Sequence, residues 1–372
     1  MAIHQLTPAM ALGDAIGNQT DAIRTALRSW GIESQVYAER RDMKSSDPGE
    51  DYRRLRLRPH DWLIYHHGID SAVTPTALKH LDRLIFVYHN VTPSAFLYGY
   101  NDHLAGLTDS GRGHLDRFRD APVVWSDSEY NAQELHALGF LDALRVIMPL
   151  RVDTVGLHAS ADSAAGRRIT AQYLKAGSTL PGRPEASPAA VNWLFVGRLA
   201  PNKRQDAIVK AFNYYQRLIN PQSRLLLVGS GLYTPGYQIE LESSIHSLGL
   251  DGKAILAGSP SLAEGFGGYY AAANVFVCAS EHEGFCVPIV EAMSFGIPVV
   301  AYGHSGVVHA VGDGGMLVED NAPATLAEAA HWMLSDAGVQ AHYRARQPAR
   351  VEAFGQAQFE ASLKAEVERL AS

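Results

Sequence analysis

The chain has 372 residues, of which 47% are hydrophobic and 19% charged, a balance that excludes disordered and fibrous proteins and suits two domains. Asp and Glu outnumber Lys and Arg by 39 to 32, so the net charge of −7 gives no support to nucleic-acid binding. The 2 cysteines, Cys278 and Cys286, are too few for a disulfide framework and favour a reducing compartment. We expect a cytoplasmic protein, since signal-peptide features and a bilayer-spanning apolar run are both absent.

Short apolar runs alternate with helical patterns in the first half of the chain. The strand-like runs are 3–6, 34–38, 62–65, 84–88, 123–125 and 146–148. A turn around Gly13 and Gly17 follows the first run, apolar residues then recur at helical spacing from Ile23 to Trp30, and Gly31 stands where a helix ends. Continuously apolar runs are typical of strands buried on both faces of a parallel sheet. Residues 1–152 are therefore predicted to form a Rossmann-like domain.

The pattern lapses over 153–190, where the Pro, Gly and Ser content of 178–188 is typical of a linker. It restarts in 191–353 with strand-like runs at 193–196, 225–228, 254–257, 275–278, 299–302 and 316–318. Helical patterns fill the gaps at 205–219, 238–248, 288–295 and 325–334, and another ends near Ala273. Strands that alternate with helices predict a second doubly wound parallel sheet. Two such domains place the expected ligand site in a cleft between them.

Several common signatures are absent. No segment matches the three-glycine dinucleotide fingerprint or the GxxxxGK[ST] phosphate loop. The zinc-protease pattern fails after His282, no Asp-x-Asp occurs, and the pair His66-His67 lacks metal-site spacing, so a core or solvent role is favoured for the histidines. We expect no metal and no bound cofactor.

The most informative segment is 280–293, which follows the strand-like run 275–278 and lies where open α/β sheets bind ligands. Pro288 suits the first turn of the next helix, which is expected to contain Glu291, with Glu283 in the preceding loop. Carboxylates there accept hydrogen bonds from ligand hydroxyls, backbone N–H groups contact phosphate, and Gly284 allows close approach. A sugar joined to a nucleoside diphosphate carries both hydroxyl groups and phosphates, and so suits both kinds of contact. Alternatively, the two glutamates only favour the positive end of the helix.

A second segment, 195–203, follows another strand-like run and places Arg198 and Lys203 at the next strand-to-helix turn. Two cations there can neutralise a diphosphate, Arg through a bidentate fork and Lys as a point charge. A solvated Lys at a helix start is common, so the prediction depends on the combination of Lys203 with Arg198 and the two glutamates.

The run 53–58 is a local charge cluster in which Leu residues alternate with Arg53, Arg54, Arg56 and Arg58. It is interpreted either as a solvated edge or as an electrostatic contact with a membrane surface or an anionic acceptor.

These segments make the chain resemble the retaining glycosyltransferases of family 4. The resemblance rests on Glu283-x7-Glu291, on Gly197-Arg198 with Lys203, on 296–300 and on the glycine-containing run 13–18. The run 88–93 is similar to a subgroup that acts on bacterial polysaccharide and O-antigen precursors. The resemblance covers essentially the whole chain and is most specific in its second half. It implies the GT-B fold: two Rossmann-like doubly wound domains that face across a cleft, with a C-terminal helix, 354–372, that crosses back to the first domain.

The resemblance also implies roles for individual residues. Arg198 and Lys203 hold the donor diphosphate, Glu283 faces the donor sugar, and Glu291 binds the ribose hydroxyls. Backbone at Gly17 meets the diphosphate or sugar. The stretch that meets the donor sugar after Glu283 comprises Gly284, Phe285, Cys286 and Val287. His89 lies near the reaction centre, so the residues assigned to catalysis are His89, Arg198, Lys203 and Glu283. One departure is His309, which stands where many relatives have a glutamate.

The implied activity is metal-independent, retaining transfer of a hexose from a nucleotide diphosphate sugar, with mannose from GDP-mannose as the favoured donor. The implied acceptor is a saccharide, a polyprenyl-diphosphate-linked oligosaccharide in polysaccharide biosynthesis, met at the cytoplasmic face of the inner membrane. Alternatives are a UDP-sugar-dependent glycosyltransferase, a GT-B-like epimerase or phosphorylase, and a non-catalytic binder of sugar nucleotides.

Overall fold

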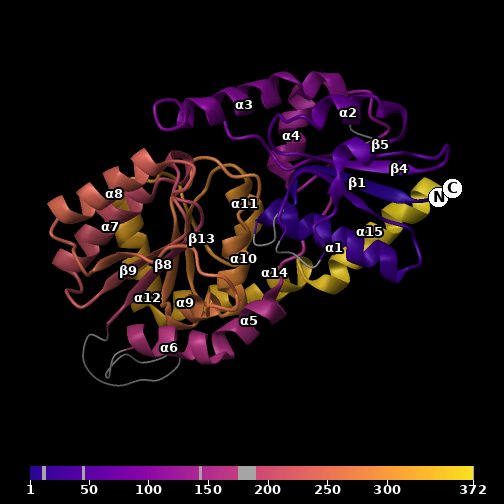
Figure 1. Cartoon of the computed structure of the whole chain (residues 1–372). Coiled ribbons are helices and arrows are strands. Elements are labelled where there is room, and N and C mark those ends of the chain that lie inside the picture. The colour runs from indigo at the N-terminus through magenta and orange to yellow at the C-terminus, as the bar shows by residue number, and fades with distance from the viewer. Residues whose placement is uncertain (11–13, 44–46, 142–144, 175–189, 372) are drawn as a thin grey trace. The chain divides into compact units, whose positions relative to one another are not determined.

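The computed structural model describes residues 1–10, 14–43, 47–141, 145–174 and 190–371, which divide into two compact units (Figure 1). Unit 1 comprises Met1–Tyr98, Asp102–Arg151 and Gln356–Ser372. Unit 2 comprises Gly99–Asn101 and Val152–Gly355. Each unit is built on its own sheet, and each is described here by itself.

The sheet of unit 1 is parallel throughout, with strand order β3-β2-β1-β4-β5-β6-β7. Its strands are β1 (Ile3–Met10), β2 (Val36–Arg41), β3 (Glu50–Asp51), β4 (Trp62–His67), β5 (Leu84–Tyr88), β6 (Val123–Ser126) and β7 (Arg145–Ile147). The chain order reverses between β1 and β4, which are neighbours in the sheet. Ligands bind α/β sheets at such a switch point, beyond the carboxyl ends of the strands.

Helices cover both faces of this sheet. They are α1 (Ala15–Ser29), α2 (Thr74–Leu78), α3 (Asp102–Gly113), α4 (Glu129–Ala137) and α15 (Gln356–Ala371). Helices α1 and α15 share one apolar cluster, in which Phe359, Leu363 and Val367 recur every four residues along α15 and pack with the strand residue Ile64. The cluster on the other face includes Phe118. The C-terminal helix therefore packs in unit 1, as predicted.

The sheet of unit 2 is also parallel, with strand order β10-β9-β8-β11-β12-β13. Its strands are β8 (Asn192–Val196), β9 (Arg224–Val228), β10 (Ala254–Leu256), β11 (Val275–Cys278), β12 (Val299–Tyr302) and β13 (Met316–Val318). The switch point lies between β8 and β11. The segments that leave these two strands at their carboxyl ends are those that contain Lys203 and Glu283.

The helices of unit 2 enclose its sheet (Figure 1). They are α5 (Thr154–Asp162), α6 (Ala164–Tyr173), α7 (Gln205–Leu218), α8 (Pro235–Ser247), α9 (Gly267–Ala272), α10 (Val287–Ser294), α11 (Gly306–Val311), α12 (Pro323–Ser335), α13 (Ala337–Arg344) and α14 (Gln347–Ala353). Helix α7 packs on α12, and α9 packs on both α5 and α6. No helix of either unit, within the described residues, is both long enough and apolar enough to span a membrane.

Of the predicted linker 153–190, the structure describes 153–174 and residue 190, and 153–174 are largely helical. Its first part forms α5 and α6, which belong to unit 2, and 175–189 lie outside the described residues. Two glycines of α9 permit close packing on these helices, since a Cβ at Gly267 would overlap the Leu157 carbonyl oxygen and one at Gly268 would overlap that of Gly166. The described part of this segment is therefore helical and in tight contact with α9.

Candidate functional site

Two loops meet at the switch point of unit 2 because β8 and β11 are paired in the sheet. The first continues from β8 through a short 3-10 helix, Pro201–Lys203, into α7, and the second continues from β11 into α10. Buried Asn202 joins them, since its side-chain amide donates to the His282 carbonyl (2.9 Å) and its backbone carbonyl accepts from the Glu281 N–H (2.9 Å). This clamp holds the cationic loop against the acidic loop.

The Lys203 ammonium and the Glu283 carboxylate form an ion pair across the two loops. Their side chains keep only 15% and 8% of their exposure, so solvent screens this pair less than a surface pair. The second carboxylate oxygen of Glu283 accepts from the Ser280 hydroxyl at 3.0 Å. The residues predicted to meet the diphosphate and the sugar therefore neutralise each other in this structure.

The backbone of Glu283 is fixed from the other side by the start of α11. The Glu283 N–H donates to the Ser305 hydroxyl, and the Gly306 N–H donates to the Glu283 carbonyl, each at 3.0 Å. Ser305 has a φ of 54°, and a Cβ at Gly306 would overlap the Gly284 carbonyl, so the Glu283 loop and the start of α11 are closely packed.

The stretch after Glu283 enters α10. The Phe285 ring is buried against His309 (5.9 Å between centroids) and Phe354 (4.7 Å), so it packs in the core of unit 2. Cys286 is a buried, free thiol with a φ of 84° at the cap of α10, which begins at Val287. His309, the residue that departs from the family pattern, therefore lies beside this stretch. Its backbone carbonyl accepts from the Arg350 guanidinium.

Glu291 lies one position beyond the first turn of α10, not within it as predicted, because the helix begins at Val287. The buried Tyr270 hydroxyl donates to its carboxylate at 2.5 Å. Burial raises the pKa of the Glu291 carboxyl to about 7, the Tyr270 hydrogen bond lowers it in part, and the charge of Asp153 raises it further.

This raised pKa predicts a pH-dependent stability. Since the folded protein holds the proton more tightly than the unfolded chain, whose carboxyl titrates near 4.5, the stabilisation is complete below pH 4.5 and is lost as the pH rises through about 7. Glu291→Gln stays neutral, so we expect it to gain about 1–2 kcal/mol over wild type between about pH 5 and about pH 8, after allowance for partial exposure. Urea unfolding measures this difference. The exposed Glu328→Gln is the control, and a pH-independent difference for Glu291→Gln would contradict the assignment.

Arg198 lies between β8 and Pro201 in the same loop, and its side chain is exposed. Its backbone carbonyl accepts from the Gln205 side chain at 2.8 Å, which fixes the loop while the guanidinium faces solvent. Among the described residues, no carboxylate forms an ion pair with Arg198. Of the two predicted diphosphate ligands, Arg198 is thus available, and Lys203 is engaged.

Gly17 and His89 belong to unit 1. Gly17 lies in the first turn of α1 rather than in a loop, and Gly13 lies outside the described residues. His89 follows β5, but its side chain is only 3% exposed, and both ring nitrogens are hydrogen-bonded, Nδ1 to Asp127 and Nε2 to His66, at 2.8 Å each. The ring is therefore engaged within the protein instead of facing a ligand.

The arginines of 53–58 are largely paired. Arg53 contacts Asp51 (3.3 Å), and Arg54 contacts Glu50 (3.1 Å). Arg58 contacts both Glu33 (2.7 Å) and Asp61 (2.9 Å). This part of the surface therefore carries little net positive charge.

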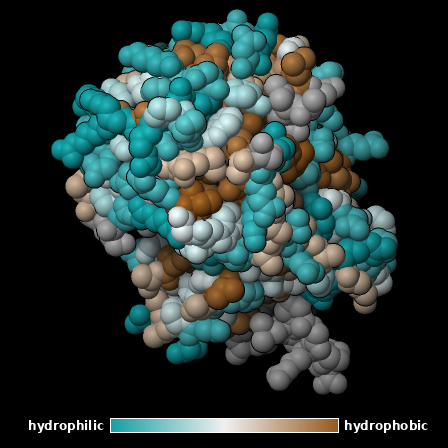
Figure 2. All heavy atoms as spheres, turned by 90° about the vertical axis from the view of Figure 1, so that its right-hand side faces the viewer, coloured by the Kyte–Doolittle hydropathy of each residue, from teal (hydrophilic) through white to brown (hydrophobic). Residues whose placement is uncertain are grey.

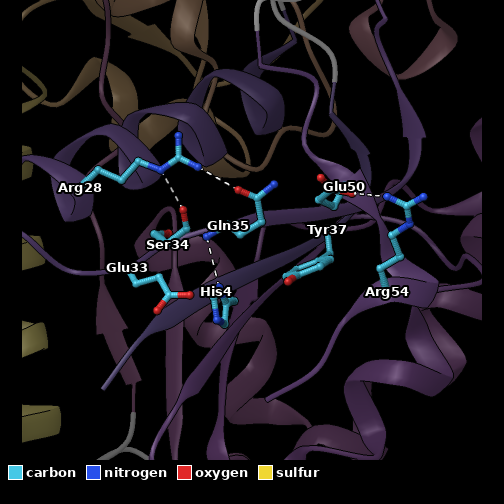
Figure 3. Close-up of a pocket in the computed structure, with 8 residues that line it drawn as sticks. All are labelled: His4, Arg28, Glu33, Ser34, Gln35, Tyr37, Glu50 and Arg54. Atoms are coloured by element: carbon cyan, nitrogen blue, oxygen red, sulfur yellow. Dashed lines mark hydrogen bonds and ion pairs between the residues drawn. The ribbon is translucent and has the colours of Figure 1, made fainter. Parts of the chain in front are cut away.

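A pocket of about 610 Å³ lies in unit 1 near the start of β1 and β2 (Figure 3). It is lined by His4, Arg28, Glu33, Ser34, Gln35, Tyr37, Glu50 and Arg54. In this pocket, His4 Nδ1 accepts a hydrogen bond from the Gln35 backbone N–H at 3.2 Å, and burial lowers the pKa of His4. The pocket lies at the end of the strands opposite to the carboxyl ends and contains none of the predicted site residues.

Sequence reasoning missed the residues that position the site. Asn202, Ser280, Ser305 and Tyr270 each contact a predicted residue or its loop, but none stands in a recognisable spacing. Asn202 and Ser280 lie inside the two segments singled out from the sequence, which is the one signal that could have drawn attention to them.

Residues 190–356 match the family model described as Glycosyl transferases group 1. The matched residues make up most of unit 2.

Two curated relatives match parts of the chain. D-inositol 3-phosphate glycosyltransferase of Salinispora arenicola is 33% identical over 187 residues, 48% of this chain and 40% of that protein. GDP-mannose-dependent alpha-mannosyltransferase of Mycolicibacterium smegmatis is 35% identical over 109 residues, 29% and 24% respectively. The chain thus spans less than half the length of these relatives.

Solved structures match the fold over the whole chain. Sucrose-phosphate synthase from Thermosynechococcus elongatus has a TM-score of 0.73, 19% identity and 100% coverage of both chains. Anabaena HepE in complex with UDP and glucose has a TM-score of 0.68, 19% identity and 99% coverage of both. The predicted fold class, two Rossmann-like parallel-sheet domains of the GT-B type, is confirmed.

Proposed function

We propose that this protein is a retaining glycosyltransferase that moves a hexose from a nucleotide diphosphate sugar to a saccharide acceptor. The observation that carries the proposal is the charge arrangement at the switch point of unit 2, where Lys203 is paired with Glu283 and Arg198 is exposed in the same loop. A diphosphate needs the cations, and sugar hydroxyls need the carboxylate. The group 1 family match of this part of the chain supports the same chemistry.

In the proposed reaction, the acceptor hydroxyl attacks the anomeric carbon from the face that the diphosphate leaves. Arg198, Lys203 and the N-terminus of α10 stabilise the charge that develops on the leaving diphosphate. The leaving phosphate itself accepts the acceptor proton, so this route needs no separate base. Glu283 binds the donor sugar, and Glu291 accepts hydrogen bonds from the ribose hydroxyls. This route uses no metal.

We favour GDP-mannose as the donor and a lipid-linked oligosaccharide as the acceptor. GDP-mannose-dependent mannosyltransferases are among the relatives, and O-antigen chain mannosyltransferase B of Escherichia coli is 48% identical over 52 residues, although these are only 14% of each chain. The alternative donor is a UDP-sugar, since solved structures that share the fold hold UDP.

The proposed lipid-linked acceptor would be met at the cytoplasmic face of the inner membrane. The run 53–58 gives this contact little electrostatic support, because three of its four arginines are paired with carboxylates. On the face shown in Figure 2, hydrophilic residues predominate and hydrophobic ones occur in small groups. We therefore propose that the acceptor, rather than a basic surface, brings the enzyme to the membrane.

A panel of nucleotide sugars tests the proposal through slow donor hydrolysis, scored by which nucleoside diphosphate is released. We expect GDP from GDP-mannose, and release of UDP alone would replace mannose with a UDP-sugar donor. Arg198→Ala should reduce the release at least 10-fold, since one of two diphosphate cations is lost. Arg217→Ala, on the exposed side of α7, is the matched control. Unchanged activity of Arg198→Ala would favour a non-catalytic binder, and an epimerised product would favour an epimerase.

A further inference from the structure

A continuous chain of hydrogen bonds crosses four neighbouring strands inside unit 1. Gln5 lies on β1, His66 on β4, His89 directly after β5 and Asp127 directly after β6, and these strands are adjacent in the sheet. Gln5 Oε1 contacts His66 Nε2 at 2.9 Å, His66 Nδ1 contacts His89 Nε2 at 2.8 Å, and His89 Nδ1 contacts Asp127 Oδ2 at 2.8 Å. All four side chains are buried.

The direction of the first bond in this chain is set by the surroundings of Gln5. The Gln5 amide Nε2 donates to the Thr20 backbone carbonyl at 3.0 Å, and a carbonyl only accepts. Gln5 therefore presents Oε1 to His66, so His66 Nε2 must carry a proton. The reversed amide would set two acceptor oxygens against each other in a buried place, which is costly.

The two imidazole rings are nearly parallel, with 10° between their planes and centroids 5.1 Å apart, and they meet nitrogen to nitrogen at their edges. The Asp127 carboxylate contacts His89 at 2.8 Å, so a positive charge is stabilised on His89 rather than on His66. Burial and the neighbouring His89 also lower the pKa of His66, so His66 is neutral and its Nδ1 is an acceptor. His89 Nε2 must then donate. If His89 Nδ1 were bare, its lone pair would face the Asp127 carboxylate at 2.8 Å, which is repulsive.

We propose that His89 is held as an imidazolium with Asp127 as its counter-ion, and that Gln5 and His66 are positioning residues that fix this state. Both N–H groups of His89 are then used inside the protein, which makes His89 a positioning residue at the carboxyl edge of the sheet. The next residue, Asn90, has a φ of 68° and donates to Asn131 at 2.8 Å, so the loop that leaves β5 starts from a fixed ring and a fixed backbone. The inference concerns protonation and goes beyond the proposed function.

The other ionisable groups around the chain leave this assignment intact. His67, next on β4, donates from Nε2 to the Gly111 carbonyl (3.0 Å), and burial lowers its pKa to about 4, so it is neutral. Asp70 accepts a hydrogen bond from Ser110 (2.6 Å), lies 3.3 Å from His114 and raises the pKa of His67 in part. From α4, Glu134 accepts from the Tyr88 hydroxyl and pairs with Arg112. The counter-ion in direct contact with His89 is Asp127.

Imidazole ¹⁵N NMR of the full-length, histidine-labelled protein at neutral pH reads these protons directly. We expect both nitrogens of His89 to resonate as protonated, and His66 to show a protonated Nε2 with a bare Nδ1. His67 is the internal control, with the neutral Nε2–H form. Signals are assigned by their loss in His66→Gln and His89→Gln. A neutral His89, in either tautomer, would overturn the proposal.

Asp127→Asn provides a second test that retains the size of the side chain. Its amide can donate to His89 Nδ1, so we expect this nitrogen alone to shift to the bare position while Nε2 stays protonated. The pattern of His66 should remain unchanged. No change at His89 Nδ1 in Asp127→Asn would contradict the role of Asp127 as counter-ion. Because the wild-type spectrum is independent of transfer, its outcome is separate from that of the donor panel.

Discussion

Glu283→Gln is expected to bind free nucleoside diphosphate about 10-fold more tightly than wild type while it loses sugar transfer by about 100-fold or more. The Glu283 carboxylate engages the Lys203 ammonium, so a diphosphate that binds Lys203 has to displace this carboxylate and approach its negative charge. The neutral amide of Glu283→Gln removes both the competition for Lys203 and the repulsion of the diphosphate. It also removes the charged acceptor for the donor sugar, so binding of the product and turnover of the donor change in opposite directions.

Isothermal titration with GDP and UDP, alongside the transfer or hydrolysis rate, measures the two effects. The matched control is Glu281→Gln. Glu281 lies two positions before Glu283 and carries the same charge, but its carboxylate pairs with Arg204 instead of Lys203. Its diphosphate affinity should change by less than about 3-fold, because Lys203 stays engaged. A weaker affinity in Glu283→Gln would show that the ion pair does not compete with the ligand.

Lys203→Met is expected to weaken diphosphate binding and to lower kcat/KM for transfer by about 100- to 1,000-fold. The substitution removes a cation from the leaving diphosphate. It also leaves the Glu283 carboxylate without its partner at a site where that side chain is only 8% exposed, which adds repulsion toward the ligand.

The double variant separates these two causes. Lys203→Met combined with Glu283→Gln should bind diphosphate about 10-fold more tightly than Lys203→Met alone, since the unpaired carboxylate is gone. Lys210→Met, whose ammonium is 3.5 Å from Asp206 on the exposed side of α7, controls for loss of a lysine in this part of unit 2. Equal affinities of the double variant and Lys203→Met would exclude repulsion by Glu283.

The strands of both sheets follow from the sequence because burial on both faces leaves a local mark. The predicted run 275–278 is β11 as observed, and 84–88 is β5. The helices α5 and α6 were not predicted, because the alternating apolar pattern lapses after residue 153 and only the tertiary structure shows α9 packed against them. Residues 34–38 likewise mark β2, but the strand runs to Arg41.

The histidines show where local pattern stops being informative. The resemblance places His89 near the reaction centre, and spacing gives His66 only a core or solvent role. The structure joins the two rings in a chain whose polarity starts at the Thr20 carbonyl, which no spacing in the sequence reveals. The exposure of Arg198 and the engagement of Lys203 are similarly invisible in the segment that contains both.

The sequence alone determined two βα domains and the placement of charged side chains directly after β8 and β11, because apolar periodicity and chain position are local properties. The tertiary structure decided which charges meet. Lys203 and Glu283 are 80 residues apart and form a pair only because β8 and β11 lie side by side at the switch point. The composition and pattern of the sequence therefore define the two domains and their charged loops. The pairing of β8 with β11 decides that Glu283 and Lys203 neutralise each other.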